Sequence, residues 1–174
     1  MSARSEFTKF LKSMDESELR KELSRLYTSI PEVKMHYTME LGGEEQRKKI
    51  FDKAKSDVFN LYFIRDKARK RARVAKVKAI IKEMEKVSIF DHELVDFLLY
   101  VTRISQDYLA RRYSVTKASY NSCHYAFSKA LDKIQAGDFR SDFKKECQKI
   151  ARAETYDTGF DEMMQDAFAA VYQT

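Results

Sequence analysis

The sequence predicts an all-α fold of about nine amphipathic helices, and three observations support it. The 174 residues include only four Gly and one Pro, so the tight turns of a many-stranded β fold are scarce. Apolar residues recur at helical spacing along most of the chain. A composition of 44% hydrophobic and 34% charged residues is ordinary for soluble amphipathic helices. Because the links are short, we expect a helical bundle or a short helical-hairpin, solenoid-like stack.

Four helices are predicted before residue 65. The first ends before Asp15, which with Glu18 three residues later is typical of a capping box for the second helix. Pro31 suits the first turn of a third helix, which the pair Gly42-Gly43 ends. The fourth helix carries the apolar residues Ile50, Phe51, Ala54, Val58, Leu61 and Tyr62.

A strongly basic segment, residues 65–86, contains no Gly or Pro and is predicted to be the fifth helix. It holds ten Lys/Arg and three Asp/Glu, a net charge of +7. The whole chain holds 33 Lys/Arg and 27 Asp/Glu, a net charge of only +6. At 100° per residue, its alanines form a narrow stripe opposite a broad sector of Val, Ile and Met. The stripe consists of Ala68, Ala72, Ala75 and Ala79. We therefore expect a central helix, buried on two sides, with cations along its flanks.

Four more helices follow the basic segment. Asp91 is the predicted N-cap of a long helix through Tyr108, whose two apolar faces indicate central burial. The seventh helix carries apolar residues from Tyr120 to Ile134 and ends at Gly137, and the eighth carries Phe139, Phe143, Cys147 and Ile150. The chain turns around Gly159 into the last helix. A boundary near residue 64 lacks a Pro, Gly or Ser linker, so the sequence predicts a single all-helical domain over 1–174.

The cations of 65–86 allow two interpretations. Either they pair with acidic side chains of the same chain, or they form a positively charged surface that binds an anionic partner. The segment has no aromatic residue and no Asn, Gln, Ser or Thr, so any contact with nucleic acid is expected to be nonspecific. The residues of such a surface are Arg65, Lys67, Arg69, Lys70, Arg71, Arg73, Lys76 and Lys78.

The sequence contains only weak matches to catalytic and metal-binding motifs. The stretch from His92 to Asp96 comes within one residue of the zinc-protease pattern, but Asp96 stands where the second histidine is needed. Cys123 and His124 are adjacent, so their side chains point about 100° apart on a helix and core packing is favoured. No Glu-x-x-His motif is present for a di-metal bundle site. The sequence predicts no catalytic residue, no metal and no cofactor.

The compartment expected from the sequence is the cytoplasm. Two cysteines are too few for a disulfide scaffold, and the first residues lack the apolar stretch of a signal peptide. No window approaches 18 apolar residues, so no membrane partner is expected.

Several motifs along the chain resemble a family of small uncharacterised all-helical bacterial proteins, a domain of unknown function. They are Phe10-Leu11-Lys12-Ser13, Glu18-Leu19, Leu26-Tyr27, Pro31-Glu32-Val33-Lys34, the Ala/Lys/Arg segment, Glu93 to Tyr100, Tyr120-Asn121-Ser122 and Gly159-Phe160. The resemblance implies a cytoplasmic all-α protein and supplies no activity or functional residue.

The function expected from the sequence is that of a non-enzymatic helical binding or scaffold protein that contacts another macromolecule, such as a protein partner. The alternative is nonspecific binding of nucleic-acid backbone through the basic helix 65–86. The sequence leaves the identity of the partner and the oligomeric state open.

Overall fold

The computed structural model describes residues 2–173 and is all-α, as predicted. Between these residues the chain forms nine helices and one two-stranded antiparallel sheet. The chain divides into two compact units, an N-terminal unit of residues 1–47 and a C-terminal unit of residues 48–174. This division falls earlier than residue 64, where the sequence lacks the Pro, Gly or Ser linker of a domain boundary. A single domain over 1–174 stays a prediction.

The N-terminal unit contains α1 (Ala3–Ser13), α2 (Glu16–Ser29), α3 (Pro31–Leu41) and the first residues of α4 (Glu44–Tyr62). The predicted capping box is present, because Asp15 accepts from the Glu18 N–H while the Glu18 side chain accepts from the Asp15 N–H. Pro31 occupies the first turn of α3, as expected. A Cβ on Gly42 would lie 2.2 Å from the Thr38 carbonyl oxygen, so only glycine fits where α3 ends.

Helices α1 and α2 bury none of their residues. Their apolar faces remain open to solvent, with Phe7 53% and Leu23 54% exposed. Between α2 and α3 lies a groove of about 500 Å³. Its apolar and aromatic lining is Leu23, Tyr27, Tyr37 and Leu41.

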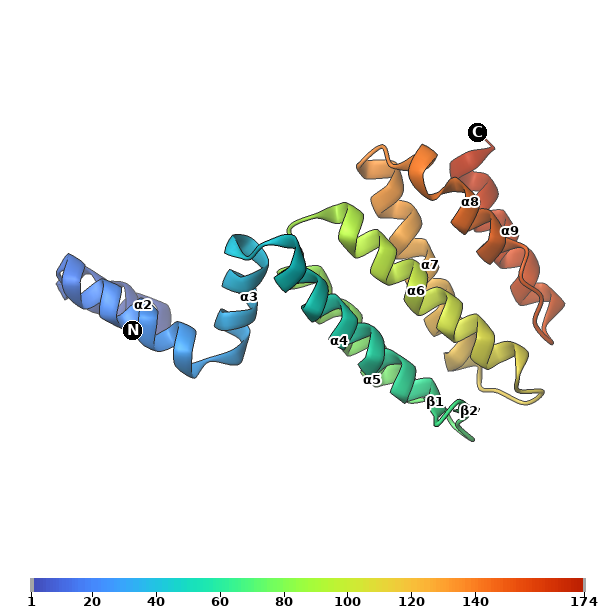
Figure 1. Ribbon diagram of the computed structural model, residues 1–174, viewed down its shortest axis with the longest axis horizontal. Coiled ribbons are helices and arrows are strands. Elements are labelled where there is room, and N and C mark those ends of the chain that lie inside the picture. The colour runs from blue at the N-terminus through green and yellow to red at the C-terminus, as the bar shows by residue number, and fades with distance from the viewer. Residues whose placement is uncertain (1, 174) are drawn as a thin grey trace. The chain divides into compact units, whose positions relative to one another are not determined.

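The C-terminal unit is a stack of helical hairpins. Figure 1 shows three sloping rows, each a pair of helices, in the order α4 and α5 (Val74–Val87), α6 (Asp91–Ala110) and α7 (Lys117–Ala136), and α8 (Arg140–Ala151) and α9 (Thr158–Tyr172). Helix α6 contacts α8, and α7 contacts both α5 and α9. The rows therefore form two layers, one of α4, α6 and α8 and one of α5, α7 and α9. This is the hairpin-stack alternative of the two architectures expected from the sequence.

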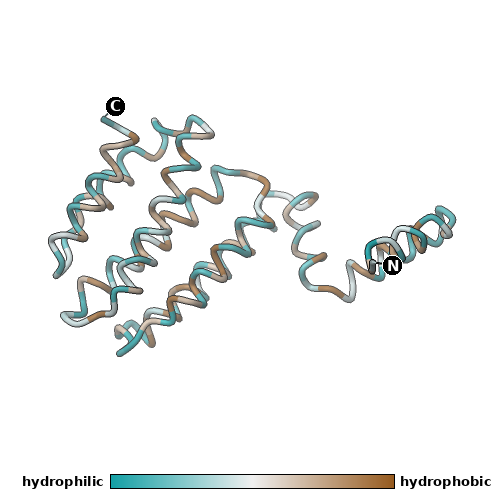
Figure 2. Tube along the Cα trace, turned by 180° about the vertical axis from the view of Figure 1, so that it is seen from behind, coloured by the Kyte–Doolittle hydropathy of each residue, from teal (hydrophilic) through white to brown (hydrophobic). Residues whose placement is uncertain are grey.

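Helix α6 is the central element of this unit, with eleven buried residues on its two apolar faces. Figure 2 shows hydrophobic residues recurring along the helices of each row. Phe97, Leu98 and Leu99 are fully buried in succession, which requires neighbours on more than one side of the helix. Each such side chain contributes about 1.5–3 kcal/mol of hydrophobic stabilisation. The prediction of central burial for this helix is therefore correct.

The prediction of one helix over 65–86 is wrong. Helix α4 ends at Tyr62, and β1 (Phe63–Ile64) pairs with β2 (Lys67–Ala68) around a two-residue turn. Helix α5 begins only at Val74. The expected alanine stripe does not exist, because Ala68 lies in β2 and Ala72 in the loop that follows. The basic segment is thus not the central helix of the fold.

Long-range contacts override the helical preference of this segment. Phe63 is 1% exposed and packs edge-on against Tyr108 of α6, with ring centroids 6.3 Å apart. Two backbone N–H groups, those of Arg69 and Arg73, donate back to the carbonyls of Tyr62 and Leu61. The burial of Phe63 beside Tyr62 ends α4 at this point. This is an effect of tertiary packing, which helix propensity does not predict.

Two predicted helix starts also differ from the structure. Asp91 is the first residue of α6, not its cap, and its carboxylate accepts from Lys133 Nζ of α7 at 2.8 Å. Helix α9 is capped by Asp157, whose carboxylate accepts from the Phe160 N–H at 3.0 Å. Gly159 therefore lies inside the first turn of α9. The predicted end of the seventh helix at Gly137 is correct.

Candidate functional site

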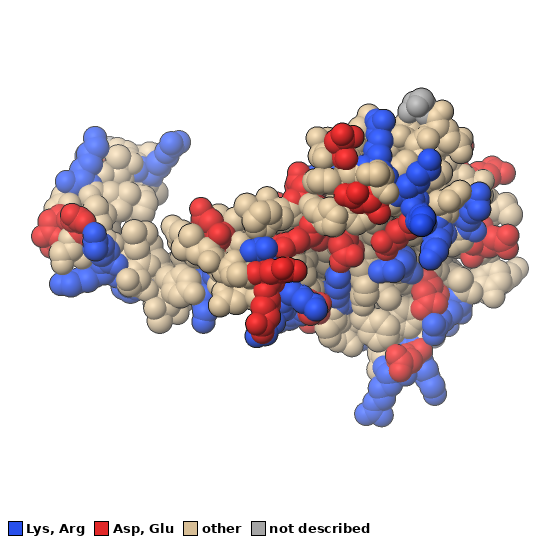
Figure 3. All heavy atoms as spheres, turned by 45° about the horizontal axis from the view of Figure 1, so that its top comes forward, with Lys and Arg blue, Asp and Glu red and all other residues tan. Residues whose placement is uncertain are grey.

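The strongest concentration of unpaired charge lies on residues 63–73, which we call the cationic hairpin. Six Lys/Arg and one Asp give these eleven residues a net charge of +5. Five of the six cations are exposed and Arg69 is half-buried. Figure 3 shows blue side chains projecting from the lower edge of the C-terminal unit, where Figure 1 places β1 and β2. The cations are Arg65, Lys67, Arg69, Lys70, Arg71 and Arg73.

The six cations of the cationic hairpin form no ion pair with any acidic side chain in residues 2–173. Cations elsewhere in this unit do pair, as Lys55 does with Asp96 at 2.5 Å. Arg69 instead donates through Nε to the Asn60 carbonyl oxygen at 2.8 Å. Of the two interpretations of the basic segment, internal ion pairing is therefore not what the structure shows.

Two arginines that follow α6 hold the hairpin in place. Arg111 donates to the Asp66 carbonyl oxygen at 3.3 Å, and its guanidinium lies 5.3 Å from the ring centroid of Phe63. Arg112 donates to the Lys70 carbonyl oxygen at 3.4 Å. These contacts add two more cations to the same surface, although Arg111 is also paired with Asp107 at 2.7 Å.

The turn of the cationic hairpin goes against local backbone preference. Arg65 and Asp66 have φ angles of 47° and 62°, the left-handed region that a two-residue hairpin turn of this kind requires. Gly and Asn usually fill such turns, and a residue with a Cβ costs about 1–2 kcal/mol there. The chain therefore keeps an arginine at the tip of the hairpin at some expense in stability.

The beginning of α5 also carries charge of the unfavourable sign. Arg73 is its N-cap and Lys76 lies in its first turn, where no acidic residue is present. A helix N-terminus favours anions by about 0.3–1 kcal/mol and disfavours cations similarly. An anion bound here would relieve both this repulsion and the mutual repulsion of the hairpin cations.

Seven of the eight residues singled out in the sequence lie together on the cationic hairpin and the first turn of α5. The eighth, Lys78, is half-buried on α5 with its Nζ 5.2 Å from the ring centroid of Tyr125 of α7. Lys78 is therefore committed to a contact between helices.

The other sequence candidates do not converge. His92 lies 3.8 Å from Asp142, whereas Asp96 pairs with Lys55. The two end residues of the near match to a zinc motif therefore contact different partners and do not point at a common site. A third histidine, His36, lies 3.5 Å from Glu40 one turn away on the surface of α3. No group of three or more His, Cys, Asp or Glu side chains within residues 2–173 is arranged to hold a metal ion.

Both cysteines lie in the core, where burial suppresses their reactivity. Burial raises the pKa of the Cys123 thiol well above its ordinary value and that of Cys147 to about 11. The Cys123 thiol donates to the Thr102 carbonyl oxygen at 3.6 Å. His124 instead lies beside Ser128, 3.5 Å away, so it does not activate the neighbouring thiol.

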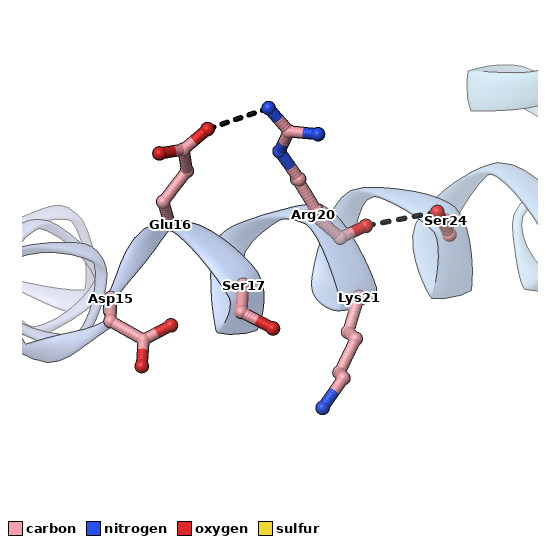
Figure 4. Close-up of a pocket in the computed structure, with 6 residues that line it drawn as sticks. All are labelled: Asp15, Glu16, Ser17, Arg20, Lys21 and Ser24. Atoms are coloured by element: carbon pink, nitrogen blue, oxygen red, sulfur yellow. Dashed lines mark hydrogen bonds and ion pairs between the residues drawn. The ribbon is translucent and has the colours of Figure 1, made fainter.

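One surface hollow lies along α2. Figure 4 shows its lining, in which Glu16 and Arg20 form an ion pair on one side while Lys21 points to the other. The Ser24 hydroxyl donates to the Arg20 carbonyl oxygen at 2.9 Å. These groups satisfy one another along a single helix and do not converge on a common point.

The sequence did not indicate the residues of two loops that lie at the same end of the C-terminal unit as the cationic hairpin. Arg111 and Arg112 form a visible doublet, but only the fold brings them to a segment more than 40 residues earlier. Tyr113 is 87% exposed and contacts Tyr156 of the α8–α9 loop. The sequence feature that could have indicated this surface is the Arg111-Arg112-Tyr113 run in the loop between two long helices.

Comparison with known proteins places the chain in a family. The sequence profile of a family of unknown function, DUF6155, matches residues 1–173. The chain belongs to the DUF6155 family. No curated protein and no solved structure matches the chain. The resemblance to a family of unknown function is thus confirmed, and DUF6155 carries no assigned activity.

No helix between residues 2 and 173 is both long and apolar enough to cross a membrane.

Proposed function

We propose that this chain is a non-enzymatic helical binding protein that contacts another macromolecule, and that the macromolecule is a nucleic acid held by its phosphate backbone. The observation that carries the proposal is the cationic hairpin, whose six cations have no acidic partner within residues 2–173. Arg and Lys bind phosphate oxygens directly and release condensed counterions, which makes binding favourable at low salt.

The hydrogen bonds that anchor the cationic hairpin support this function. Its backbone is tied to α4 by two hydrogen bonds and to α6 through Arg111, Arg112 and Tyr108. A fixed array of cations loses less side-chain and loop entropy on binding than a disordered basic tail does. The surface offers mainly Arg and Lys, so we expect it to bind the backbone without reading base sequence.

The direct test is the salt dependence of binding to generic DNA and RNA, measured by fluorescence anisotropy. We expect clear binding at about 50 mM salt that is lost by about 200 mM, because released counterions oppose binding as salt rises. The triple variant Lys67→Gln, Lys70→Gln, Arg71→Gln should lower the slope of log K against log salt by about 2–3.

A matched control removes three charges elsewhere. Lys86, Lys144 and Lys145 are exposed cations of the same unit, and changing all three to Gln removes the same net charge. The control should bind nearly as the unmodified protein does. No binding at low salt, or equal losses in the two triple variants, would contradict the proposal.

A second candidate function is scaffolding by self-association, which we infer from the N-terminal unit. Residues 2–30 expose Phe7, Phe10 and Leu23 and bury no side chain. Six Lys/Arg and five Asp/Glu are interspersed along these residues, a net charge of only +1. A second copy of the chain is therefore not repelled from this apolar face, whereas a strongly charged partner would find no complementary net charge on it.

Light scattering across a range of concentrations tests this second candidate. We expect the mass of the protein to rise toward that of a dimer, and the pair Phe7→Ser, Phe10→Ser to remain monomeric. A protein that stays monomeric at every concentration would rule out self-association through this surface.

We also propose a bacterial source and a cytoplasmic location. Two free buried thiols fit a reducing compartment, in which disulfides are rare. Fractionation of cells that express the chain, followed by immunodetection, should recover it in the cytoplasmic fraction.

A further inference from the structure

We infer that the loop face around the cationic hairpin takes single-stranded nucleic acid in preference to duplex, by stacking a base against the exposed pair Tyr113 and Tyr156. This inference rests on the proposed binding of phosphate backbone and names the form of nucleic acid that the surface selects. It depends on three features of the structure: where the two tyrosines lie, how exposed they are, and which charges flank them.

The two tyrosines lie at the same end of the C-terminal unit as the cationic hairpin. Figure 1 shows β1 and β2, the α6–α7 loop (111–116) and the α8–α9 loop (152–157) at the lower right ends of the three rows. Tyr113 directly follows Arg112, whose guanidinium contacts the Lys70 carbonyl oxygen. The aromatic pair and the hairpin cations are therefore connected through one arginine.

The exposure of this pair is unusual for aromatic side chains. Tyr113 is 87% exposed and Tyr156 is 59% exposed, while their ring centroids lie 5.5 Å apart at an interplanar angle of 68°. In such an edge-to-face arrangement each ring steadies the other without covering both of its faces. A free aromatic face at the same end of the unit as a group of exposed cations is the combination that single-strand binding proteins use.

A duplex cannot use this pair in the same way, because its bases are stacked on one another and only its backbone is accessible. In a single strand, a base can rest on a tyrosine ring while the neighbouring phosphates contact the hairpin cations. Two exposed acidic residues, Glu154 and Asp157, flank Tyr156 in the sequence and disfavour phosphates beside it. The strand should therefore run from the tyrosines toward the hairpin.

The test compares a labelled dT oligonucleotide with a duplex for three proteins at one low salt concentration. The unmodified protein should bind the single strand more tightly than the duplex. The variant Tyr113→Ala, Tyr156→Ala should lose about 5- to 150-fold in single-strand affinity, because one stacked base is worth about 1–3 kcal/mol, and should keep its duplex affinity. The variant Tyr113→Phe, Tyr156→Phe should bind both nearly unchanged, because stacking needs the ring and not the hydroxyl.

A spectroscopic readout separates stacking from loop damage. The chain has no Trp, so Tyr113→Trp introduces a single tryptophan at the proposed contact. Its fluorescence should be quenched by the dT oligonucleotide and unchanged by inorganic polyphosphate, which has no bases. Equal quenching by both probes would overturn the inference.

The outcomes also separate this inference from the proposed function. If the single strand and the duplex bind equally and both depend on Lys67, Lys70 and Arg71, backbone binding stands and the stacking inference fails. If neither binds at low salt, the proposed function fails and the inference fails with it.

Discussion

The backbone N–H of Ala72 donates a hydrogen bond to the hydroxyl of Tyr108 at 3.2 Å, which links the end of the cationic hairpin to α6 across 36 residues of sequence. The same tyrosine ring packs against Tyr62 and Phe63, at 5.4 and 6.3 Å between ring centroids. Tyr108 therefore holds both the start and the end of the hairpin. It explains how a segment of strong helix formers keeps an extended conformation.

The variant Tyr108→Phe keeps the ring and removes the acceptor for the Ala72 N–H. We expect the free energy of unfolding to fall by about 1 kcal/mol, the usual cost of a lost hydrogen bond. Amide hydrogen exchange at Ala72 should become faster than in the unmodified protein. Tyr113→Phe is the control, because its side chain is largely exposed, and it should change stability by less than about 0.5 kcal/mol. A similar loss in both variants would count against the structural role of Tyr108.

The variants Arg65→Gly and Asp66→Gly form a matched pair at the hairpin turn. Both residues have positive φ, so glycine at either position should raise the free energy of unfolding by about 1 kcal/mol. Their effects on binding should be opposite, because one variant removes a cation and the other removes the acid of the hairpin. Affinity for nucleic acid should fall in Arg65→Gly and rise in Asp66→Gly. A change of the same sign in both would show that charge at the turn is unimportant.

The buried carboxylate of Asp161 supports the α8–α9 loop that carries Tyr156. It accepts from the Thr155 N–H at 2.9 Å and from the Thr155 hydroxyl at 2.8 Å, and Asp161 is 9% exposed. We expect Asp161→Ala to lower the free energy of unfolding by about 2 kcal/mol, since bonds to an ionised acceptor are among the stronger ones. Chemical denaturation measures this, and the exposed Asp166→Ala on the same helix should have little effect.

Stability should decline at alkaline pH because of two buried groups. Burial raises the pKa of Cys147 from 9.0 to about 11, and that of Tyr62 from 10.0 to about 12. Since both pKa values are higher in the folded protein, the unfolded chain loses its protons first as pH rises. The stabilisation is complete below about pH 9 and is lost as pH rises toward 12. Thermal unfolding across this range should show the decline, and Cys147→Ala should make it shallower. A melting temperature that rises above pH 9 would contradict this.

The elements that the sequence predicted correctly are those governed by local chemistry. The capping box of Asp15 and Glu18, the start of α3 at Pro31 and the end of α7 at Gly137 each depend on residues within one turn. The central burial of α6 also follows from its own pattern of apolar residues. By contrast, Asp91 is not a cap because its carboxylate binds Lys133, a residue 42 positions away.

The candidate surface could be predicted only in part. Its cations are visible in the sequence as a run, and all but Lys78 are found together in the structure. The helix assigned to them was wrong because Phe63 and Tyr108 pack together, which no local pattern indicates. The pairing of Tyr113 with Tyr156 was not predicted for the same reason, since the two residues come from loops separated by more than 40 residues.

The sequence by itself determined an all-α fold, most helix boundaries and the location of the excess charge, because backbone propensity, capping and apolar periodicity act over a few residues. Only the tertiary structure decided that residues 63–73 form a short hairpin and the loop that follows it, with cations that have no acidic partner within residues 2–173. The physical reason is that two contacts with Tyr108 outweigh the helical preference of the basic segment. Phe63 packs against the Tyr108 ring, and the Ala72 N–H donates to the Tyr108 hydroxyl. The same contacts keep those cations in fixed positions on the surface.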